Sequence, residues 1–144
     1  MAGYFDSSFI LAAVLGQHQT AGCSRIWAGE PVRVSSILLN SECLISLRRI
    51  AVSQGLCAGW VQERMRACEP FLAAIVLKYV DQDVDDIIPR EERLAGCRTL
   101  DAIHLATALH FQPHLDEPLR ICSLDVRLRA VAFQVGFEVL PGAL

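Results

Sequence analysis

Short apolar runs alternate with helical segments along the whole chain, and this alternation limits the possible folds more than any other feature. Strand-like runs are predicted at residues 3–5, 31–36, 73–80, 119–124 and 137–141. Helices are predicted between and after them, at 7–16, 18–28, 37–55, 60–74, 89–97, 99–112 and 125–136. Because such an alternation builds a parallel sheet with helices on both faces, we expect a three-layer α/β/α fold with a short central parallel sheet.

The composition is that of one domain. The chain has 144 residues, of which 53% are hydrophobic, and this is enough to bury one core, so we expect a single domain over residues 1–144. Its net charge of −3 argues against a protein that binds nucleic acid through an overall basic surface, so any contact with nucleic acid must be local. Twelve arginines and a single lysine carry the positive charge. Arginine suits phosphate better than lysine does, because its planar guanidinium can donate two hydrogen bonds at once.

Cysteine usage and apolar run lengths predict the compartment. No two of the six cysteines are spaced as CxxC, so a zinc knuckle is not predicted, and we interpret them as reduced, buried thiols. The run "FILAAVLG" at 9–16 follows Asp6 instead of the basic stretch that a signal peptide has. No run reaches the ~18 apolar residues of a membrane span. We therefore expect a cytoplasmic protein without membrane contact.

Four acidic residues stand where an acid is costly. Asp6 and Asp125 each follow a predicted strand, at the strand ends where open α/β sheets place their sites. Glu42 and Asp101 lie in helices that are otherwise largely apolar. Burying an unpaired ion costs several kcal/mol, and two remedies exist, which are pairing with arginine or sharing a cation. An all-oxygen cluster favours Mg²⁺ or Mn²⁺ over zinc.

Each acid also has a simpler interpretation. Asp6 and Asp125 could cap the helices that begin after them, and Asp101 could be an acid of a first helical turn, favoured by the helix dipole. Glu42, predicted in the middle of a helix, is the hardest to explain in this way. The four acids taken together therefore carry the metal hypothesis.

Four stretches resemble one family in order and over nearly the whole chain. They are "YFDSSFIL", "SSILLNSECLISLRR", "RTLDAIHLATAL" and "CSLDVRLRAVAFQVGFEVLP", and they resemble the PIN-domain ribonucleases of the VapC toxin type. The resemblance implies a PIN-like fold and maps four acids onto the family's catalytic and metal-binding quartet, namely Asp6, Glu42, Asp101 and Asp125. Ser7 and Ser123 fall where the family often has a supporting hydroxyl. Residues 56–97 match only in general character.

The resemblance also implies a function. It predicts an Mg²⁺- or Mn²⁺-dependent endoribonuclease, the toxin of a type II toxin–antitoxin system, neutralised by a small VapB-type antitoxin that covers the active site. A homodimer and a toxin–antitoxin hetero-oligomer are expected, with DNA bound only through the antitoxin. The apolar helices near 9–16 and 37–75 could form the antitoxin groove and the dimer face. Candidate RNA contacts are Arg48, Arg49, Arg127 and Arg129.

Other interpretations stay open at this point. The chain could be a PIN nuclease of RNA processing without a toxin role, or a partner that acts by binding alone. His104, three residues after Asp101, is interpreted as a packing residue or as a neighbour of the metal ligands. The acidic stretch at 81–92 has the spacing of a calcium loop but lacks its central glycine and contains Pro89, so a solvated loop is favoured.

Overall fold

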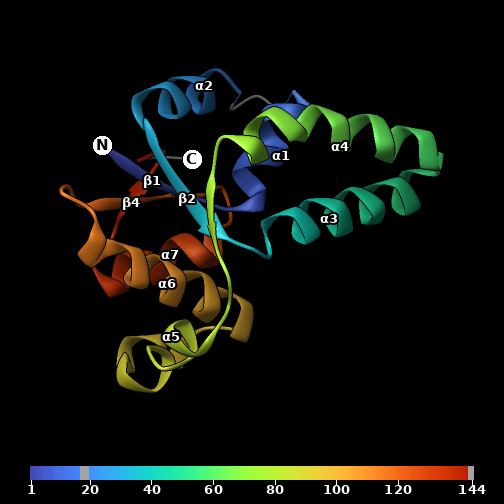
Figure 1. The fold of residues 1–144 in the computed structure, drawn as a ribbon. Coiled ribbons are helices and arrows are strands. Elements are labelled where there is room, and N and C mark those ends of the chain that lie inside the picture. Colours follow the sequence, from blue (N-terminus) through green and yellow to red (C-terminus); the bar gives the residue numbers. More distant parts are fainter. Residues whose placement is uncertain (17–19, 143–144) are drawn as a thin grey trace.

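A five-stranded parallel sheet forms the centre of the molecule (Figure 1). The computed structural model describes residues 1–16 and 20–142. The strand order is β3-β2-β1-β4-β5, and the strands are β1 (Ala2–Phe5), β2 (Val32–Ser36), β3 (Val76–Lys78), β4 (Leu119–Cys122) and β5 (Glu138–Leu140). The predicted parallel sheet is confirmed, and each strand falls within or next to a run predicted to be one.

Seven α-helices surround the sheet in the described part of the chain. They are α1 (Ser7–Leu15), α2 (Thr20–Gly29), α3 (Leu39–Gln54), α4 (Ala58–Ala73), α5 (Gln82–Asp85), α6 (Thr99–Phe111) and α7 (Val126–Val135). Figure 1 shows α1 to α4 on one side of the sheet and α5 to α7 on the other. The predicted helix at 18–28 corresponds to α2, and its first two residues lie outside the described residues.

Each face of the sheet has its own apolar core. Tyr4 and Phe5 are neighbours on β1 and point to opposite faces, as successive strand residues must. Tyr4 packs with Leu105 of α6 and Leu128 of α7, whereas Phe5 packs with Phe9 of α1 and other residues of the α1 to α4 side. The three-layer arrangement follows directly from this division, and the expected α/β/α fold class is confirmed.

Helices α3 and α4 form a hairpin that extends away from the sheet (Figure 1). The turn begins at Gly55, whose φ of 65° lies in the left-handed region that favours glycine. An apolar cavity of about 410 Å³ lies between the two helices near this turn, lined by residues such as Val52 and Leu56. Across residues 1–16 and 20–142, no helix is both long and apolar enough to span a bilayer.

The segment between β3 and α6 differs from its prediction. Residues 89–97 were expected to be one short helix, but they form two 3₁₀ turns, η1 (Ile88–Arg90) and η2 (Glu92–Gly96). A third 3₁₀ turn, η3 (Gln112–His114), follows α6. The acidic stretch contains the short helix α5, and Lys78 forms ion pairs with Asp81 and Asp83 at 2.5 and 3.7 Å. Asp81 and Asp83 are exposed, so the stretch is solvated as expected, but residues 82–85 form a helix and not a loop.

Candidate active site

Asp6 occupies the point where β1 ends and α1 begins. Its backbone amide donates to the Cys122 carbonyl of neighbouring β4 at 3.3 Å, which fixes it at the carboxyl edge of the sheet. Its carboxylate caps α1 by accepting from the Phe9 amide at 3.1 Å. The predicted capping role is therefore real, yet the side chain is only 5% exposed, which a simple cap does not require.

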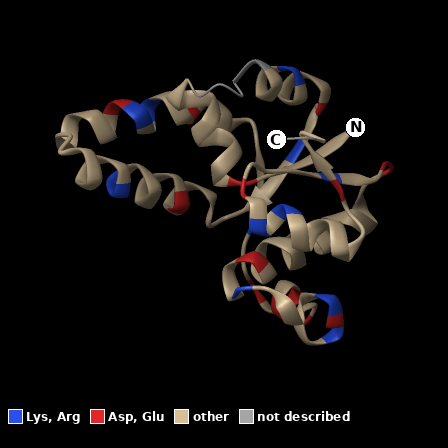
Figure 2. Ribbon diagram, turned by 180° about the vertical axis from the view of Figure 1, so that it is seen from behind, with Lys and Arg blue, Asp and Glu red and all other residues tan. Residues whose placement is uncertain are grey.

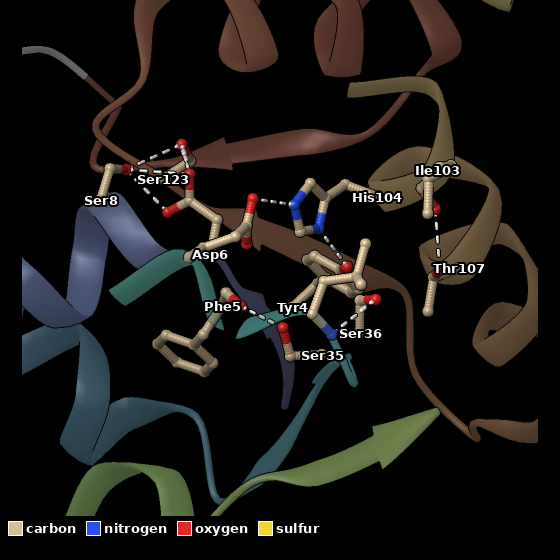
Figure 3. Close-up of polar contacts among 12 residues, drawn as sticks. Tyr4, Phe5, Asp6, Ser8, Ser35, Ser36, Ile103, His104, Thr107 and Ser123 are labelled. Atoms are coloured by element: carbon tan, nitrogen blue, oxygen red, sulfur yellow. Dashed lines mark hydrogen bonds and ion pairs between the residues drawn. The ribbon is translucent and has the colours of Figure 1, made fainter. Parts of the chain in front are cut away.

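Two serine hydroxyls surround the Asp6 carboxylate (Figure 3). Ser8 donates to Oδ1 and Oδ2 at 2.7 and 2.9 Å, and Ser123 donates to Oδ2 at 2.7 Å. Burial raises the pKa of Asp6, and these hydrogen bonds together with the His104 charge offset part of the rise. Ser7, expected as a supporting hydroxyl, lines a nearby cavity with Glu42. Sequence reasoning missed Ser8, although its place two residues after a capping aspartate was a signal.

Glu42 enters the site from α3. The helix begins at Leu39, so Glu42 lies in its first turn and not in the middle of a helix, as the sequence interpretation had placed it. Its Oε1 accepts from Nε2 of His104 at 2.9 Å. Its Oε2 is buried and has no hydrogen-bond partner among the described residues. A buried carboxylate oxygen without a partner is costly, and a bound cation would satisfy it.

His104 is buried between two polar groups. Nδ1 lies 2.7 Å from the Tyr4 hydroxyl, and the ring is only 3% exposed. Burial disfavours the charged imidazole, but the hydrogen bond to Glu42 and the charges of Glu42, Asp6 and Asp101 outweigh it and raise the pKa of His104. The sequence interpretation of His104 as a packing residue or a neighbour of the site agrees with this position.

Asp101 and Asp125 approach from the starts of two helices. Asp101 lies half-buried in the first turn of α6. Asp125 is exposed and caps α7, its Oδ1 accepting from the amides of Arg127 and Leu128 at 2.8 and 3.1 Å. Burial raises the pKa of Asp101, and the negative charge of Asp125 raises it further. Two like charges are therefore held close together here.

Two cavities that share a wall bring three of the four acids together. Glu42 and Asp125 line a cavity of about 380 Å³, and Asp101 and Asp125 line one of about 530 Å³. Arg49 and Leu100 also belong to both cavities. Asp6 lies behind them and is linked to Asp125, because Ser8 both donates to Asp6 and accepts from the Asp125 amide at 3.1 Å. The fold thus gathers residues that are distant in sequence around one region.

The predicted RNA-contacting arginines separate into two groups. Arg49 and Arg127 line the carboxylate cavities, together with Arg98, which the sequence interpretation did not single out. Arg48 lines the apolar cavity of the α3–α4 hairpin instead. The Arg129 guanidinium donates to the carbonyls of Ser123 and Pro141 at 2.8 and 2.6 Å, so it holds the ends of β4 and β5 together.

The carboxylates fit a hydrated cation better than a closed protein cage. Over the part of the chain that the structure describes, no three histidine, cysteine, aspartate or glutamate side chains form a ready-made metal cage. Mg²⁺ keeps several waters and is usually bound by one or two carboxylates together with substrate phosphates. The unpartnered Oε2 of Glu42 and the paired charges of Asp101 and Asp125 supply oxygen donors of that kind.

The class of this protein follows from its fold and from a family comparison, in which residues 3–135 match the PIN domain. The chain belongs to the PIN-domain family, as its sequence motifs predict. It is 31% identical over 141 residues to Ribonuclease VapC46 of Mycobacterium tuberculosis, and the match covers 95% of each chain. Its fold is also similar to that of M. tuberculosis VapC20, described as a sarcin-ricin loop cleaving toxin, with a TM-score of 0.64 and 17% identity over 94% of this chain and 96% of that one.

Proposed function

We propose that this protein is a divalent-metal-dependent endoribonuclease that acts as the toxin of a type II toxin–antitoxin system. The observation that carries the proposal is the buried, unpartnered Oε2 of Glu42 beside cavities lined by Asp101 and Asp125. The relative named a ribonuclease, which matches 95% of this chain, supports the reaction class. The neighbour described as a toxin shares the fold.

Four carboxylates would hold the cation, which is Mg²⁺ or Mn²⁺ in this proposal. They are Asp6, Glu42, Asp101 and Asp125, with Ser8 and Ser123 as supporting hydroxyls. A bound divalent cation supplies Lewis acidity for the attack of water on a phosphodiester and neutralises charge on the phosphate. The chain's own residues hold the donors in place: Ser8 and Ser123 fix Asp6, His104 fixes Glu42, and the α7 amides fix Asp125.

Arginines at the rim would bring the RNA to this acidic region. Figure 2 shows basic positions spread among acidic ones over several elements, in keeping with the net charge of −3. Binding of RNA therefore depends on local groups, and Arg49, Arg98 and Arg127 stand at the carboxylate cavities. We infer that these three contact phosphates, since arginine binds phosphate through a bidentate fork. Arg48 instead lines the apolar cavity of the α3–α4 hairpin, and Arg129 donates to backbone carbonyls.

The antitoxin and a second copy of the chain would bind to the apolar surfaces of the helices. The α3–α4 hairpin offers a cavity lined by Leu44, Val52, Leu56 and Val61. A second apolar cavity of about 330 Å³ lies where α1, α2 and α4 meet, lined by Phe9, Trp27 and Phe71. In this proposal the protein acts in the cytoplasm, and DNA is bound only through the antitoxin.

Cleavage of total RNA with and without a chelator tests the proposal. The purified chain should cleave RNA in Mg²⁺ or Mn²⁺ and lose this activity in EDTA, and Asp101→Asn should be inactive while still folded by circular dichroism. Expression of the wild-type chain, but not of Asp101→Asn, should arrest bacterial growth. Equal cleavage in EDTA would refute the metal requirement, and cleavage without growth arrest would favour a PIN nuclease of RNA processing.

A further inference from the structure

A buried hydrogen-bonded chain connects three elements behind the carboxylate cavities. The Tyr4 hydroxyl of β1 lies 2.7 Å from Nδ1 of His104 on α6, and Nε2 of the same ring lies 2.9 Å from Oε1 of Glu42 on α3. Tyr4 and His104 are 0% and 3% exposed. Figure 3 shows the imidazole with one nitrogen directed toward Tyr4 and the other away from it. These hydrogen bonds therefore connect the core to a carboxylate of the proposed metal site.

The protons on these groups determine which atom donates and which accepts in each of the two hydrogen bonds. Burial raises the pKa of Tyr4, so its hydroxyl keeps its proton. A carboxylate can only accept, so Oε1 of Glu42 accepts from Nε2, which carries the proton of a neutral His104 ring. Nδ1 of that neutral ring is then an acceptor, and the Tyr4 hydroxyl donates to it at 2.7 Å. In either charge state of the ring, Nε2 is therefore a donor toward Glu42.

This bond orients the Glu42 carboxylate and leaves one of its oxygens available. Oε1 accepts from His104, whereas Oε2 is buried and lacks a hydrogen-bond partner in the described part of the chain. We propose that His104 is a positioning residue, backed by Tyr4, that orients Glu42 for a divalent cation. The inference rests on the metal-dependent function proposed above and adds to it the groups that hold one ligand in place.

Core packing alone does not account for a histidine at this position. Leu105 and Ala106, the next residues on α6, are apolar and fully buried. An apolar side chain at position 104 would avoid the free-energy cost of burying an imidazole, which is repaid only when its nitrogens are bonded. His104 has both nitrogens bonded, and its charge interactions reach Asp6 and Asp101 as well as Glu42. The imidazole therefore faces the carboxylates as a group.

Binding of Mn²⁺ alone to the full-length protein, measured by electron paramagnetic resonance of the free ion, tests this role without any substrate. His104→Phe keeps a ring but loses both hydrogen bonds, and it should weaken Mn²⁺ binding about 10- to 100-fold. His104→Gln restores a donor near Glu42 and should recover part of the affinity. Tyr4→Phe should cause a smaller loss. The double variant should bind no more weakly than His104→Phe, because Tyr4 acts through His104.

Thr107→Val is the matched control. Thr107 is also buried on α6, and its hydroxyl donates to the Ile103 carbonyl of the same helix at 2.7 Å, away from the carboxylates. This variant removes a buried hydrogen bond from α6 and should leave Mn²⁺ affinity unchanged. A folded His104→Phe that binds Mn²⁺ as the wild type does, or that loses no more affinity than Thr107→Val, would overturn the proposal.

Two further outcomes separate this inference from the proposed function. If His104→Phe does not fold, His104→Gln and Tyr4→Phe decide, and wild-type affinity in both would overturn the positioning role. If the wild-type chain binds no Mn²⁺, the metal-dependent function and this inference both fail. If the wild type binds Mn²⁺ and the His104 variants bind it equally well, only the inference fails.

Discussion

At the scale of single residues, the Ser8 hydroxyl joins two loops that follow different strands. It donates to Asp6 after β1 and accepts from the amides of Leu124 and Asp125 after β4, at 2.8 and 3.1 Å. The Ser123 hydroxyl makes the same pair of contacts, at 2.7 Å to Asp6 and 3.0 Å from the Asp125 amide, so two hydroxyls fix the relative position of acids that are 119 residues apart. Stability and site geometry depend on the same hydroxyl groups.

Ser8→Ala should lower the free energy of unfolding by about 1–3 kcal/mol, because it removes a hydrogen bond to the buried Asp6 carboxylate and the partner of the Leu124 amide. Ser7→Ala is the matched control, since the Ser7 side chain lines the carboxylate cavity, and its effect should stay within about 0.5 kcal/mol. Urea denaturation of the metal-free proteins measures both. Equal effects of the two substitutions would contradict the role of Ser8 as a link between the two loops.

Arg48 and Arg49 are neighbours in sequence that face different cavities. Arg49→Ala should weaken RNA binding and reduce the slope of log affinity against log salt by about one, as expected for one lost phosphate contact. Arg48→Ala removes the same charge and should leave the slope nearly unchanged. Fluorescence anisotropy of a labelled RNA, measured across a series of salt concentrations, compares them. The assignment fails if Arg48→Ala has the larger effect.

At the scale of elements, the α3–α4 hairpin carries apolar side chains away from the sheet. Val52, near the turn, is 85% exposed and borders the apolar cavity between the two helices. Single exposed apolar residues are common on protein surfaces, but this one is continuous with a cavity. The hairpin is therefore the element on which the proposed dimer face is tested.

Val52→Lys should weaken self-association at least about tenfold, or ~1.4 kcal/mol, because it places a charge on an apolar contact surface. RNA cleavage per active site should be retained, since the carboxylate cavities are lined by other residues. Sedimentation velocity over a range of concentrations gives the association constant. Ser53→Lys adds the same charge at the adjacent exposed position, which does not line the cavity. If Ser53→Lys disrupts association equally, the dimer face lies elsewhere.

The elements that sequence predicts well are those defined by apolar periodicity. Helix α6 and strands β1 and β4 can be located because their side chains are largely buried, which leaves a mostly apolar run in the sequence, short for the two strands. The run at 73–80 was predicted as one strand, but Ala73 ends α4 and only Val76–Lys78 pair with β2. Alanine fits both elements, so composition alone does not locate that boundary.

The site itself was only partly predictable for a geometric reason. Which of two adjacent serines reaches Asp6, and which arginines face the cavities, depends on helix rotation by a single residue. Ser8 rather than Ser7 bonds to Asp6, and Arg129 turns to the backbone carbonyls of Ser123 and Pro141. A sequence pattern gives the residue types and their order, whereas these directions come from the packing of the helices on the sheet.

At the scale of the whole molecule, the buried and clustered carboxylates of the site are unfavourable in their charged form, and a bound cation would offset this cost. Burial raises the pKa of Asp6 and Asp101 above their ordinary value of 3.8, and the neighbouring carboxylates raise the pKa of His104. All three groups hold protons more tightly in the folded than in the unfolded chain. Their contribution to stability is present below the unfolded pKa values and is lost as the pH rises through the folded ones.

Asp101→Asn should therefore reduce the loss of stability of the metal-free protein between acidic and neutral pH. The difference between wild type and variant isolates the Asp101 contribution, because the other groups are common to both. Thermal unfolding in chelator at a series of pH values measures it. A steeper loss of stability in Asp101→Asn than in the wild type would contradict the raised pKa of Asp101.

Adding Mn²⁺ should raise the free energy of unfolding, in contrast to the loss that a rise in pH causes in the metal-free protein. At a Mn²⁺ concentration 100 times its dissociation constant, the wild type should gain about 2.7 kcal/mol of stability. Asp101→Asn should gain less, because it offers fewer negative charges to the cation. Thermal unfolding at fixed pH with and without Mn²⁺ gives both values, and equal gains would argue against Asp101 as a ligand.

The capping of α7 by Asp125 has a practical consequence for anyone who needs an inert form of this protein. Both α7 amides bond to the same oxygen, Oδ1, and asparagine caps a helix about as well as aspartate. Asp125→Asn would thus keep the oxygen that holds the helix and discard only the charge. Alanine at this position would remove both at once, so a silent alanine variant would leave the cause ambiguous. Under the proposed function, the asparagine form is the one suited to holding an uncut RNA or a partner chain for study.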